Sequence, residues 1–252
     1  MNDMIVEFWN KHAKGYGDSI RSSLSGDDVK MWRNFIFKWI DSSEELNILD
    51  IGTGPGFFPA ILTDVNRHVT GIDLSGEMVK QARENLKLQG VEAEILNMDC
   101  HKTEFEDDTF DVLICRNLVW TLSDPMGAYR EWRRILKPKG RLLIFDGSWY
   151  AHHYFDDARE EFERKSKELF NRTGMYAYNY GDIDTDPEDY EMRINLFLSD
   201  KKRPEWDCDF LKSIGFQIFD VKNNYLEEIM KPVEMERSTD ISPVFFICAL
   251  NS

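Results

Sequence analysis

The sequence predicts an α/β fold in which helices cover both faces of a mostly parallel sheet. Residues 46–147 alternate short apolar runs, typical of buried strands, with longer segments whose apolar residues recur every three or four positions. This alternation implies parallel strands joined by helices. The first apolar run leads directly into a glycine-rich loop and then a helix. Ligands of open α/β sheets bind beside such loops, at the carboxyl ends of the strands.

Two segments before the sheet have helical patterns. Residues 4–9 are amphipathic, and in residues 29–40 the large apolar side chains recur at three- and four-residue spacing. Between them, Gly15 and Gly17 flank Tyr16, and glycine weakens a helix. We therefore expect residues 11–18 to form a loop.

Strand and helix signals alternate through the predicted sheet. Ser75 is a predicted helix N-cap and Gly90 the matching helix end, while Asp124 with Pro125 opens a later helix that stops before Gly140. The predicted strands cover residues 46–50, 68–73, 93–96 and 110–115, with a fifth ending near residue 145, and the first two helices cover residues 57–65 and 75–89.

Residues 149–204 contain no clear strand–helix unit. A connection this long between sheet elements is normally functional, so we interpret it as a cap over the active site. The sheet is expected to resume after it. The predicted elements are a charged helix near residues 157–170, an aromatic stretch at 176–180, a helix at 206–214 and strands at 216–221 and 244–250.

The glycine-rich loop distinguishes between classes of nucleotide ligand. Residues 46–56 read LNILDIGTGPG. A dinucleotide loop that starts at Gly52 would need glycine at position 57, which is Phe57, and no P-loop Gly-Lys-Ser/Thr follows. Asp50 would repel a pyrophosphate but attract a cation. The loop therefore indicates a nucleoside with a positively charged tail and no phosphate.

The run from Asp50 to Gly56 resembles the first motif of the class I S-adenosylmethionine-dependent methyltransferases and matches it at every defined position. The resemblance implies S-adenosylmethionine as cofactor, S-adenosylhomocysteine as product, and methyl transfer as activity. It also implies a Rossmann-like, seven-stranded, mostly parallel sheet whose antiparallel last strand lies beside the fifth. The cofactor contacts that it implies in this loop are Asp50, Gly52, Thr53, Gly54 and Gly56.

Acids after the second and third strands extend the resemblance. Asp73 lies about 20 residues after Gly52, where a carboxylate can accept the ribose hydroxyls. It could instead serve as an acid at a helix N-terminus, but it precedes the predicted cap. In the family, an acid at the position of Asp99 accepts from the adenine amino group, and the backbone of the next residue, Cys100, meets the ring. Asp99 could also be an ordinary turn residue.

Two apolar residues are candidates for the adenine surface. Leu74 and Met78 follow Asp73 and could cover the ring. Their spacing is also that of residues packed into the core, so either role fits them.

Two loops are expected beside the transferred methyl group. In the family, the loop after the fourth strand lies near the methionine moiety, which implies a cofactor contact for Arg116 and places Trp120 near the acceptor. The loop after the fifth strand contains His152 and His153. His152 could act as a base, since imidazole titrates near neutrality, or the pair could be solvated. Adjacent residues rarely reach one ion together, so no metal site is predicted.

The family also suggests how the chain is organised around the core. In many members an N-terminal helix pair covers the cofactor, and a tyrosine near the position of Tyr16 reaches toward it. Tyr16 could therefore act at the active site or pack beneath the lid. The implied units are a lid at residues 1–45, a cofactor-binding core at 46–148 and 205–252, and a substrate cap at 149–204.

Composition restricts the methyl acceptor. The chain has 252 residues and a formal net charge of −15, which disfavours nucleic acids and anionic membrane surfaces as partners. Its four cysteines match no zinc motif, and we expect neither a signal peptide nor a membrane span, so a cytoplasmic location is predicted. A small-molecule acceptor is favoured. The alternatives are a protein acceptor, a non-catalytic S-adenosylmethionine-binding protein, and a nicotinamide oxidoreductase, which Asp50 and the glycine spacing oppose.

Overall fold

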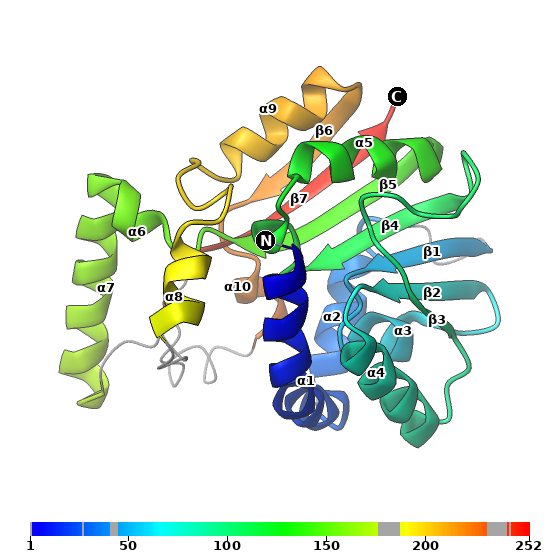
Figure 1. Cartoon of the computed structure of the whole chain (residues 1–252), viewed down its shortest axis with the longest axis horizontal. Coiled ribbons are helices and arrows are strands. Elements are labelled where there is room, and N and C mark those ends of the chain that lie inside the picture. Colours follow the sequence, from blue (N-terminus) through cyan, green and yellow to red (C-terminus); the bar gives the residue numbers. More distant parts are fainter. Residues whose placement is uncertain (1, 27, 41–44, 176–186, 231–240, 242) are drawn as a thin grey trace.

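A seven-stranded sheet organises the computed structural model, which describes residues 2–26, 28–40, 45–175, 187–230, 241 and 243–252 (Figure 1). The strand order is β3-β2-β1-β4-β5-β7-β6, and β7 runs antiparallel to both of its neighbours. The predicted fold class is therefore confirmed, including the antiparallel last strand beside the fifth. The strands are β1 (Leu46–Ile51), β2 (Arg67–Asp73), β3 (Glu94–Asn97), β4 (Phe110–Arg116), β5 (Leu136–Gly147), β6 (Phe216–Lys222) and β7 (Val244–Asn251).

Apolar side chains fill both faces of the sheet. Along β4, Leu113 and Cys115 point into one hydrophobic cluster while Ile114 points into another, as the two-residue period of a strand requires. All three are fully buried. Trp132 belongs to the first cluster and Phe35 to the second, which places helices on both faces.

The predicted helix ends are confirmed around the sheet. The hydroxyl of Ser75 accepts the backbone N–H of Met78 at 3.1 Å, and Gly90 ends the same helix with a left-handed φ of 65°. Asp124 accepts the N–H of Gly127 at 2.9 Å. The helices around these strands are α3 (Phe57–Leu62), α4 (Gly76–Gln89), η1 (Val119–Thr121) and α5 (Pro125–Ile135).

The N-terminal segment differs from the prediction. Residues 11–18, expected to form a loop, belong to one continuous helix, α1 (Asn2–Leu24), which α2 (Asp28–Ile36) follows. A Cβ atom at Gly17 would collide with the side-chain oxygen of Gln81 on α4. Gly17 therefore lies where α1 packs closely against α4, and this packing outweighs the low helix propensity of glycine.

Beyond β5 the chain forms several helices before it returns to the sheet. Helices α6 (Ala151–Tyr154) and α7 (Asp156–Thr173) stand at the opposite end of the molecule from β3, with α8 (Pro187–Ile194) between them and α1 in the view of Figure 1. The aromatic stretch at 176–180 lies outside the described residues. The last helices are α9 (Glu205–Ser213) and α10 (Leu226–Ile229).

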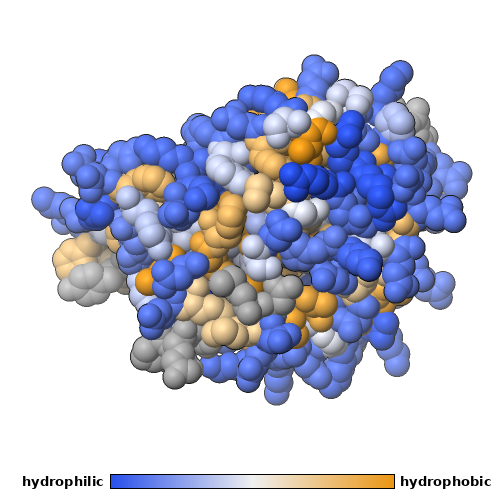
Figure 2. Space-filling model, turned by 45° about the horizontal axis from the view of Figure 1, so that its top comes forward, coloured by the Kyte–Doolittle hydropathy of each residue, from blue (hydrophilic) through white to orange (hydrophobic). Residues whose placement is uncertain are grey.

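The surface agrees with the charge of the chain. Hydrophilic side chains cover most of the face shown in Figure 2, with apolar residues gathered along its middle. Among the described helices, none combines the length and the apolar character needed to cross a membrane.

A buried ion-pair network ties α9 to the sheet. Arg203 donates through Nη2 to Asp146 at the end of β5 at 3.1 Å and through Nε to Asp207 at 2.8 Å. The hydroxyl of Tyr129 donates to Asp207 at 2.6 Å. The side chains of Arg203 and both acids are at most 1% exposed. Burial raises the pKa of Asp146, and the nearby guanidinium opposes that rise.

Replacing Arg203 with methionine should destabilise the protein strongly, because Asp146 and Asp207 would remain buried without their cation. We expect a loss of about 3–5 kcal/mol in the free energy of unfolding, measured by urea denaturation. The control is Lys202→Met, which breaks an exposed 3.0 Å pair with Asp157 and should cost less than about 1 kcal/mol. Equal losses in the two variants would contradict the importance assigned to the buried network.

Candidate functional site

A single cleft brings most of the predicted site residues together. It lies at the carboxyl ends of β1, β2, β3 and β4, with α1 along one side. The cofactor residues predicted from the sequence that line it are Asp50, Gly52, Thr53, Gly54, Asp73, Leu74, Met78, Asp99, Cys100 and Arg116.

The glycine loop approaches the cleft through its backbone. Gly54 has a left-handed φ of 51°, which disfavours any residue with a side chain. A Cβ at this position would lie 3.5 Å from the ring of Tyr16, so the loop and α1 face each other here. The backbone at Gly54 can therefore contact a ligand directly.

Asp73 connects this loop to the next strand and helix. Its carboxylate accepts the N–H of Gly54 and the N–H of Ser75, each at 2.9 Å. Loss of hydration raises the pKa of Asp73 to about 6, and these two hydrogen bonds limit the rise. Each carboxylate oxygen keeps further acceptor capacity for a ligand hydroxyl in the cleft.

Asp50 places a buried carboxylate beneath the loop. Asp50 is 2% exposed, and the Thr53 hydroxyl donates a hydrogen bond to its carboxylate, with 2.6 Å between the two oxygens. Burial raises the pKa of Asp50 to about 7, while the Thr53 hydrogen bond and the charge of Arg116 lower it. Such an acid attracts a cationic group into the cleft.

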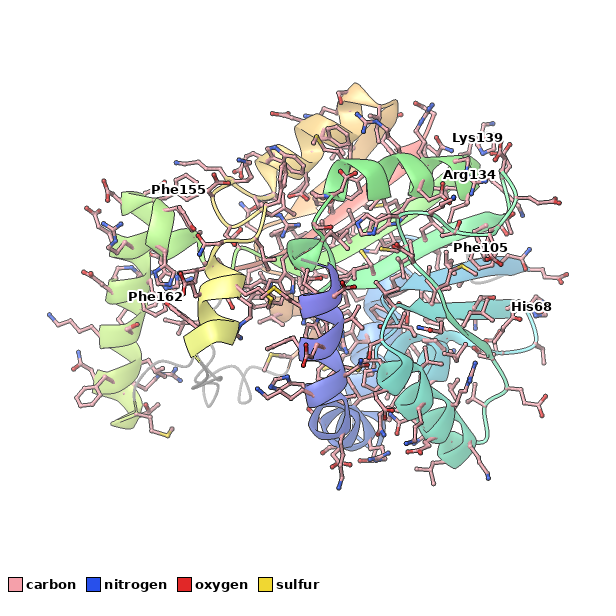
Figure 3. The ribbon with its side chains drawn as sticks, viewed as in Figure 1. His68, Phe105, Arg134, Lys139, Phe155 and Phe162 are labelled. Atoms are coloured by element: carbon pink, nitrogen blue, oxygen red, sulfur yellow. The ribbon has the colours of Figure 1, made fainter. Side chains whose placement is uncertain are left out.

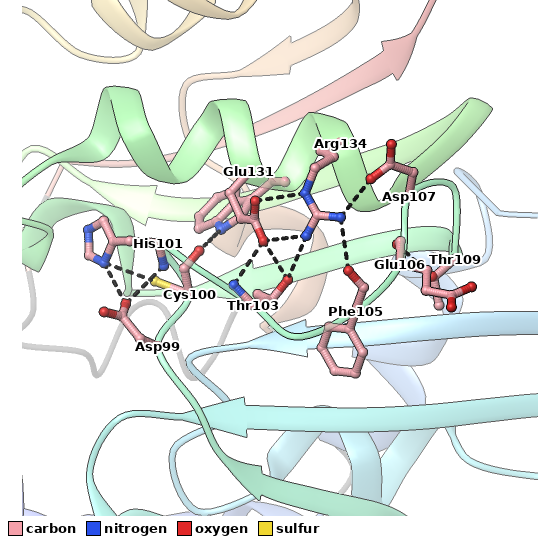
Figure 4. A network of polar contacts seen from close by, with 11 residues as sticks. Asp99, Cys100, His101, Thr103, Phe105, Glu106, Asp107, Thr109, Glu131 and Arg134 are labelled. Carbon is pink, nitrogen blue, oxygen red and sulfur yellow. Dashed lines mark hydrogen bonds and ion pairs between the residues drawn. The ribbon is translucent and has the colours of Figure 1, made fainter.

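Side chains of α5 hold the loop after β3 in place through polar contacts (Figure 4). Asp99 accepts the backbone N–H of His101 at 2.9 Å and contacts its Nδ1 at 2.7 Å. Glu131 accepts both the N–H and the hydroxyl of Thr103, at 2.8 and 2.6 Å, and pairs with Arg134. These contacts fix Asp99 at the rim of the cleft.

The loop after β4 has an unusual backbone. Asn117 adopts a left-handed φ of 54°, which is uncommon outside glycine. Its N–H donates to the carbonyl of Phe145 at 2.8 Å, and its carbonyl accepts the indole N–H of Trp120 at 3.0 Å. Backbone strain of this kind is concentrated at functional sites. The turn holds the main chain at Arg116 against the cleft.

One predicted cofactor residue lies outside the cleft. Gly56 is not among the lining residues, and a Cβ atom there would be 3.1 Å from the Cβ of Ala82 on α4. Its position instead allows the start of α3 to pack against α4.

The three predicted catalytic candidates have different positions. Tyr16 lines the cleft. Trp120 does not, but its ring lies 6.5 Å from that of Trp9, which does. His152 also lies outside the cleft and stacks on Phe162 of α7, with ring centroids 4.4 Å apart; Figure 3 labels Phe162 on that helix. Burial lowers the pKa of His152 to about 4, and the charges of His153 and Arg159 add to this.

Several cleft residues were not identified from the sequence. Ile5, Val6 and Trp9 come from α1. Trp9 and Tyr16 are seven residues apart, which is two turns of a helix and hence one face, and their rings lie 6.1 Å apart. Because residues 11–18 were predicted to form a loop, the shared helix face of these two residues was not recognised from the sequence. Further cleft residues of this kind include Pro55, Phe57, Phe58, Ile72, Met98, His101, Leu118, Thr121, Leu122 and Ser123.

Comparisons with known proteins agree with this geometry. Residues 49–144 match the family model described as a methyltransferase domain. A ubiquinone/menaquinone biosynthesis C-methyltransferase UbiE from Geotalea daltonii is 32% identical over 152 residues, which cover 58% of this chain and 64% of that protein. The UbiE protein of Shewanella sediminis is 25% identical, over 88% of this chain and 86% of its own length. A methyltransferase structure from Methanosarcina mazei shares the fold, with a TM-score of 0.57 at 21% identity, over 86% of this chain and 96% of that one.

Replacing Asp73 with alanine should weaken S-adenosylhomocysteine binding roughly 10- to 100-fold, because Asp73 is predicted to accept the ribose hydroxyls and the variant would lose this charged acceptor. Isothermal titration calorimetry measures this directly. Asp111→Ala is a matched control, since Asp111 also accepts a backbone N–H, from Asn47 at 2.9 Å, yet does not line the cleft. Unchanged affinity in Asp73→Ala would refute the ribose role.

Proposed function

We propose that this chain, whose residues 49–144 match a methyltransferase domain, is an S-adenosylmethionine-dependent enzyme that transfers the methyl group to a small-molecule acceptor. The observation that carries the proposal is one cleft lined by acids from β1, from β2 and from the loop after β3, together with apolar residues of α1. The relatives named as C-methyltransferases support a carbon acceptor on a small molecule.

The residues present suit the cofactor. The backbone at Gly54 is open to the cleft, and the buried carboxylate of Asp50 suits a ligand that carries positive charge. Asp73 would hold the ribose and Asp99 the adenine amino group, with Leu74 and Met78 beside the ring. When bound, S-adenosylmethionine supplies an electrophilic methyl group on a sulfonium.

The task of the chain is then to position the acceptor and exclude water. Ile5, Val6 and Trp9 on α1 line the cleft together with Leu118 and Leu122, so this part of its wall is apolar. An acceptor held in line between them would gain on the order of 7–11 kcal/mol from orientation alone. We propose that residues 1–45 act as a lid and residues 149–204 as a cap that shapes the acceptor site.

Among the catalytic candidates, Tyr16 is the one that faces the cleft. Trp120 would support the acceptor wall through Trp9. With a pKa of about 4, His152 is neutral at pH 7, but to accept a proton from the acceptor its ring would have to leave Phe162. A cytoplasmic location is also proposed, supported by four cysteines that are all free thiols.

Incubation with methyl-labelled S-adenosylmethionine and a panel of phenols, quinols, amines and thiols tests the proposed activity. We expect S-adenosylhomocysteine to form only when a small acceptor is added, with the label in the low-molecular-mass fraction. Gly54→Val, whose side chain would enter the cleft, should abolish turnover and serves as the control. Label in added protein would favour a protein acceptor, and tight cofactor binding without turnover on any acceptor would favour a non-catalytic role.

Binding of S-adenosylmethionine should depend on the ionisation of Asp50. Because its pKa is raised to about 7, the carboxylate is charged above pH 7 and loses its charge as the pH falls. A cation that needs this charge should bind about tenfold more weakly at pH 6 than at pH 8. Asp50→Asn should flatten the profile and also corrects for titration of the ligand. The same slope in both proteins, measured by calorimetry, would contradict the role of Asp50.

A further inference from the structure

We propose that the buried carboxylate of Asp146 is a positioning residue for the methyl acceptor, because it holds the main chain of the loop after β4 at Trp120. This loop, residues 117–123, supplies Leu118 and Leu122 to the apolar part of the cleft. Asp146 itself does not line the cleft, so it would act through the loop and not by touching a ligand. The inference rests on the proposed function, since it concerns where the acceptor would lie.

Strand pairing with β5 reaches only the beginning of this loop. Strand β4 ends at Arg116, which is paired with Phe145 of β5. The N–H of Asn117 still donates to the carbonyl of Phe145 at 2.8 Å, and the chain then turns through the left-handed φ of Asn117. The residues that follow have left the ladder of strand hydrogen bonds. They therefore need another support to stay against the cleft.

The carboxylate of Asp146 provides that support. Its Oδ2 atom accepts the backbone N–H of Trp120 at 3.0 Å, and its Oδ1 atom accepts the N–H of Gly147 at 2.9 Å. Trp120 lies in the short helix η1, and the first N–H groups of a helix have no carbonyl partner within it. An ionised carboxylate accepts such an N–H more strongly than a neutral group does. Asp146 therefore fixes the main chain of η1 relative to β5.

Arg203 fixes the carboxylate in turn. Its Nη2 atom donates to the same Oδ2 atom at 3.1 Å, and its Nη1 atom donates to the carbonyl of Gly147 at 3.3 Å. The side chain of Asp146 is 0% exposed and that of Arg203 is 1% exposed, so bulk water does not compete for these contacts. Arg203 lies near the end of residues 149–204, the segment proposed to shape the acceptor site. Strand β5, the loop after β4 and this segment thus meet at one carboxylate.

The Trp120 ring connects this main chain to helix α1. Trp120 is 5% exposed, and its indole N–H donates to the carbonyl of Asn117 at 3.0 Å. Its ring meets that of Trp9 edge-on, with centroids 6.5 Å apart, and Trp9 lines the cleft. A shift of Trp120 would therefore move the loop after β4 and disturb its contact with α1. A displacement of about 1 Å in an active site can cost on the order of 100-fold in rate.

Asp207 provides a comparison within the same network. It is also 0% exposed, and it accepts hydrogen bonds from Nε of Arg203 at 2.8 Å and from the hydroxyl of Tyr129 at 2.6 Å. Neither of these two partners belongs to the loop after β4. Loss of either acid should destabilise the fold, but only loss of Asp146 should release Trp120.

The backbone amide of Trp120 tests this difference in the whole chain saturated with S-adenosylhomocysteine. In Asp146→Ala its downfield proton shift should disappear from NMR spectra. Its protection from hydrogen exchange, relative to that of Ile144 in β5, should fall about tenfold or more, because a charged acceptor is lost. Asp146→Asn should retain most of both, since its amide oxygen can still accept the N–H. The matched control is Asp207→Ala, which removes the other buried acid and should leave both readings unchanged.

Binding of an acceptor probe measures the consequence at the site. The probe is 2-naphthol, a planar apolar phenol, titrated by fluorescence into the protein saturated with S-adenosylhomocysteine. Its affinity should fall about tenfold in Asp146→Ala and stay within about twofold of the wild-type value in Asp146→Asn and Asp207→Ala. The affinity for S-adenosylhomocysteine itself, measured by calorimetry, should be the same in all four proteins, because neither acid lines the cleft.

Equal effects of Asp146→Ala and Asp207→Ala would mean that the network only stabilises the fold, and would overturn the inference. So would an Asp146→Ala protein that keeps either the protection of Trp120 or the affinity for the probe. A Trp120 amide that already exchanges freely in the wild type would overturn it even if the alanine variants failed to fold. In each of these cases the proposed function stands. A wild type that binds S-adenosylhomocysteine but not 2-naphthol would instead overturn the proposed apolar acceptor site and, with it, the inference.

Discussion

The carboxylate of Asp73 joins three elements at the edge of the sheet. It accepts the N–H of Gly54 in the loop after β1 and the N–H of Ser75 at the cap of α4, while it ends β2 itself. The backbone carbonyl of Asp73 also accepts the N–H of Met98, which begins the loop that carries Asp99. One residue thus sets the relative positions of the glycine loop, the α4 terminus and the loop after β3, and the cleft follows from that arrangement.

The buried carboxylates behind β5 and the buried carboxylate in the cleft differ in whether the protein supplies a counter-ion. Behind β5, Asp146 and Asp207 are neutralised by Arg203, so this part of the fold carries its own counter-ion. In the cleft, Asp50 is buried and forms no ion pair with the described residues, and its raised pKa means that its ionisation, largely complete above pH 7, disfavours the empty folded protein. A cationic ligand would remove that penalty. The structure therefore leaves its unbalanced charge where a ligand can balance it.

The sheet and the donor half of the site were predictable because their signals are local. Ser75, Gly90 and Asp124 mark helix ends through their own backbone chemistry, and the run from Asp50 to Gly56 keeps a fixed spacing. The break predicted near Gly15 and Gly17 was wrong because the close approach of Gln81, 64 residues away, decides the conformation there. The Arg203 network is equally long-range, since Asp146 and Tyr129 carry no local sign that an arginine will be buried between them.

The acceptor side of the site depends on the same long-range packing. Continuity of α1 through Gly17 is what places Trp9 and Tyr16 on one face, above the cleft and beside the glycine loop. Polar contacts to α4 secure the helix: the Asn10 side chain accepts the Ser75 hydroxyl at 2.6 Å, and Arg21 donates to Asn85 at 2.9 Å. Ser75 is also the α4 cap next to Asp73. Helix α1, which lines the acceptor side of the cleft, is therefore hydrogen-bonded to α4, whose cap lies next to the proposed cofactor residue Asp73. The packing of these two helices would set the position of the acceptor relative to the cofactor.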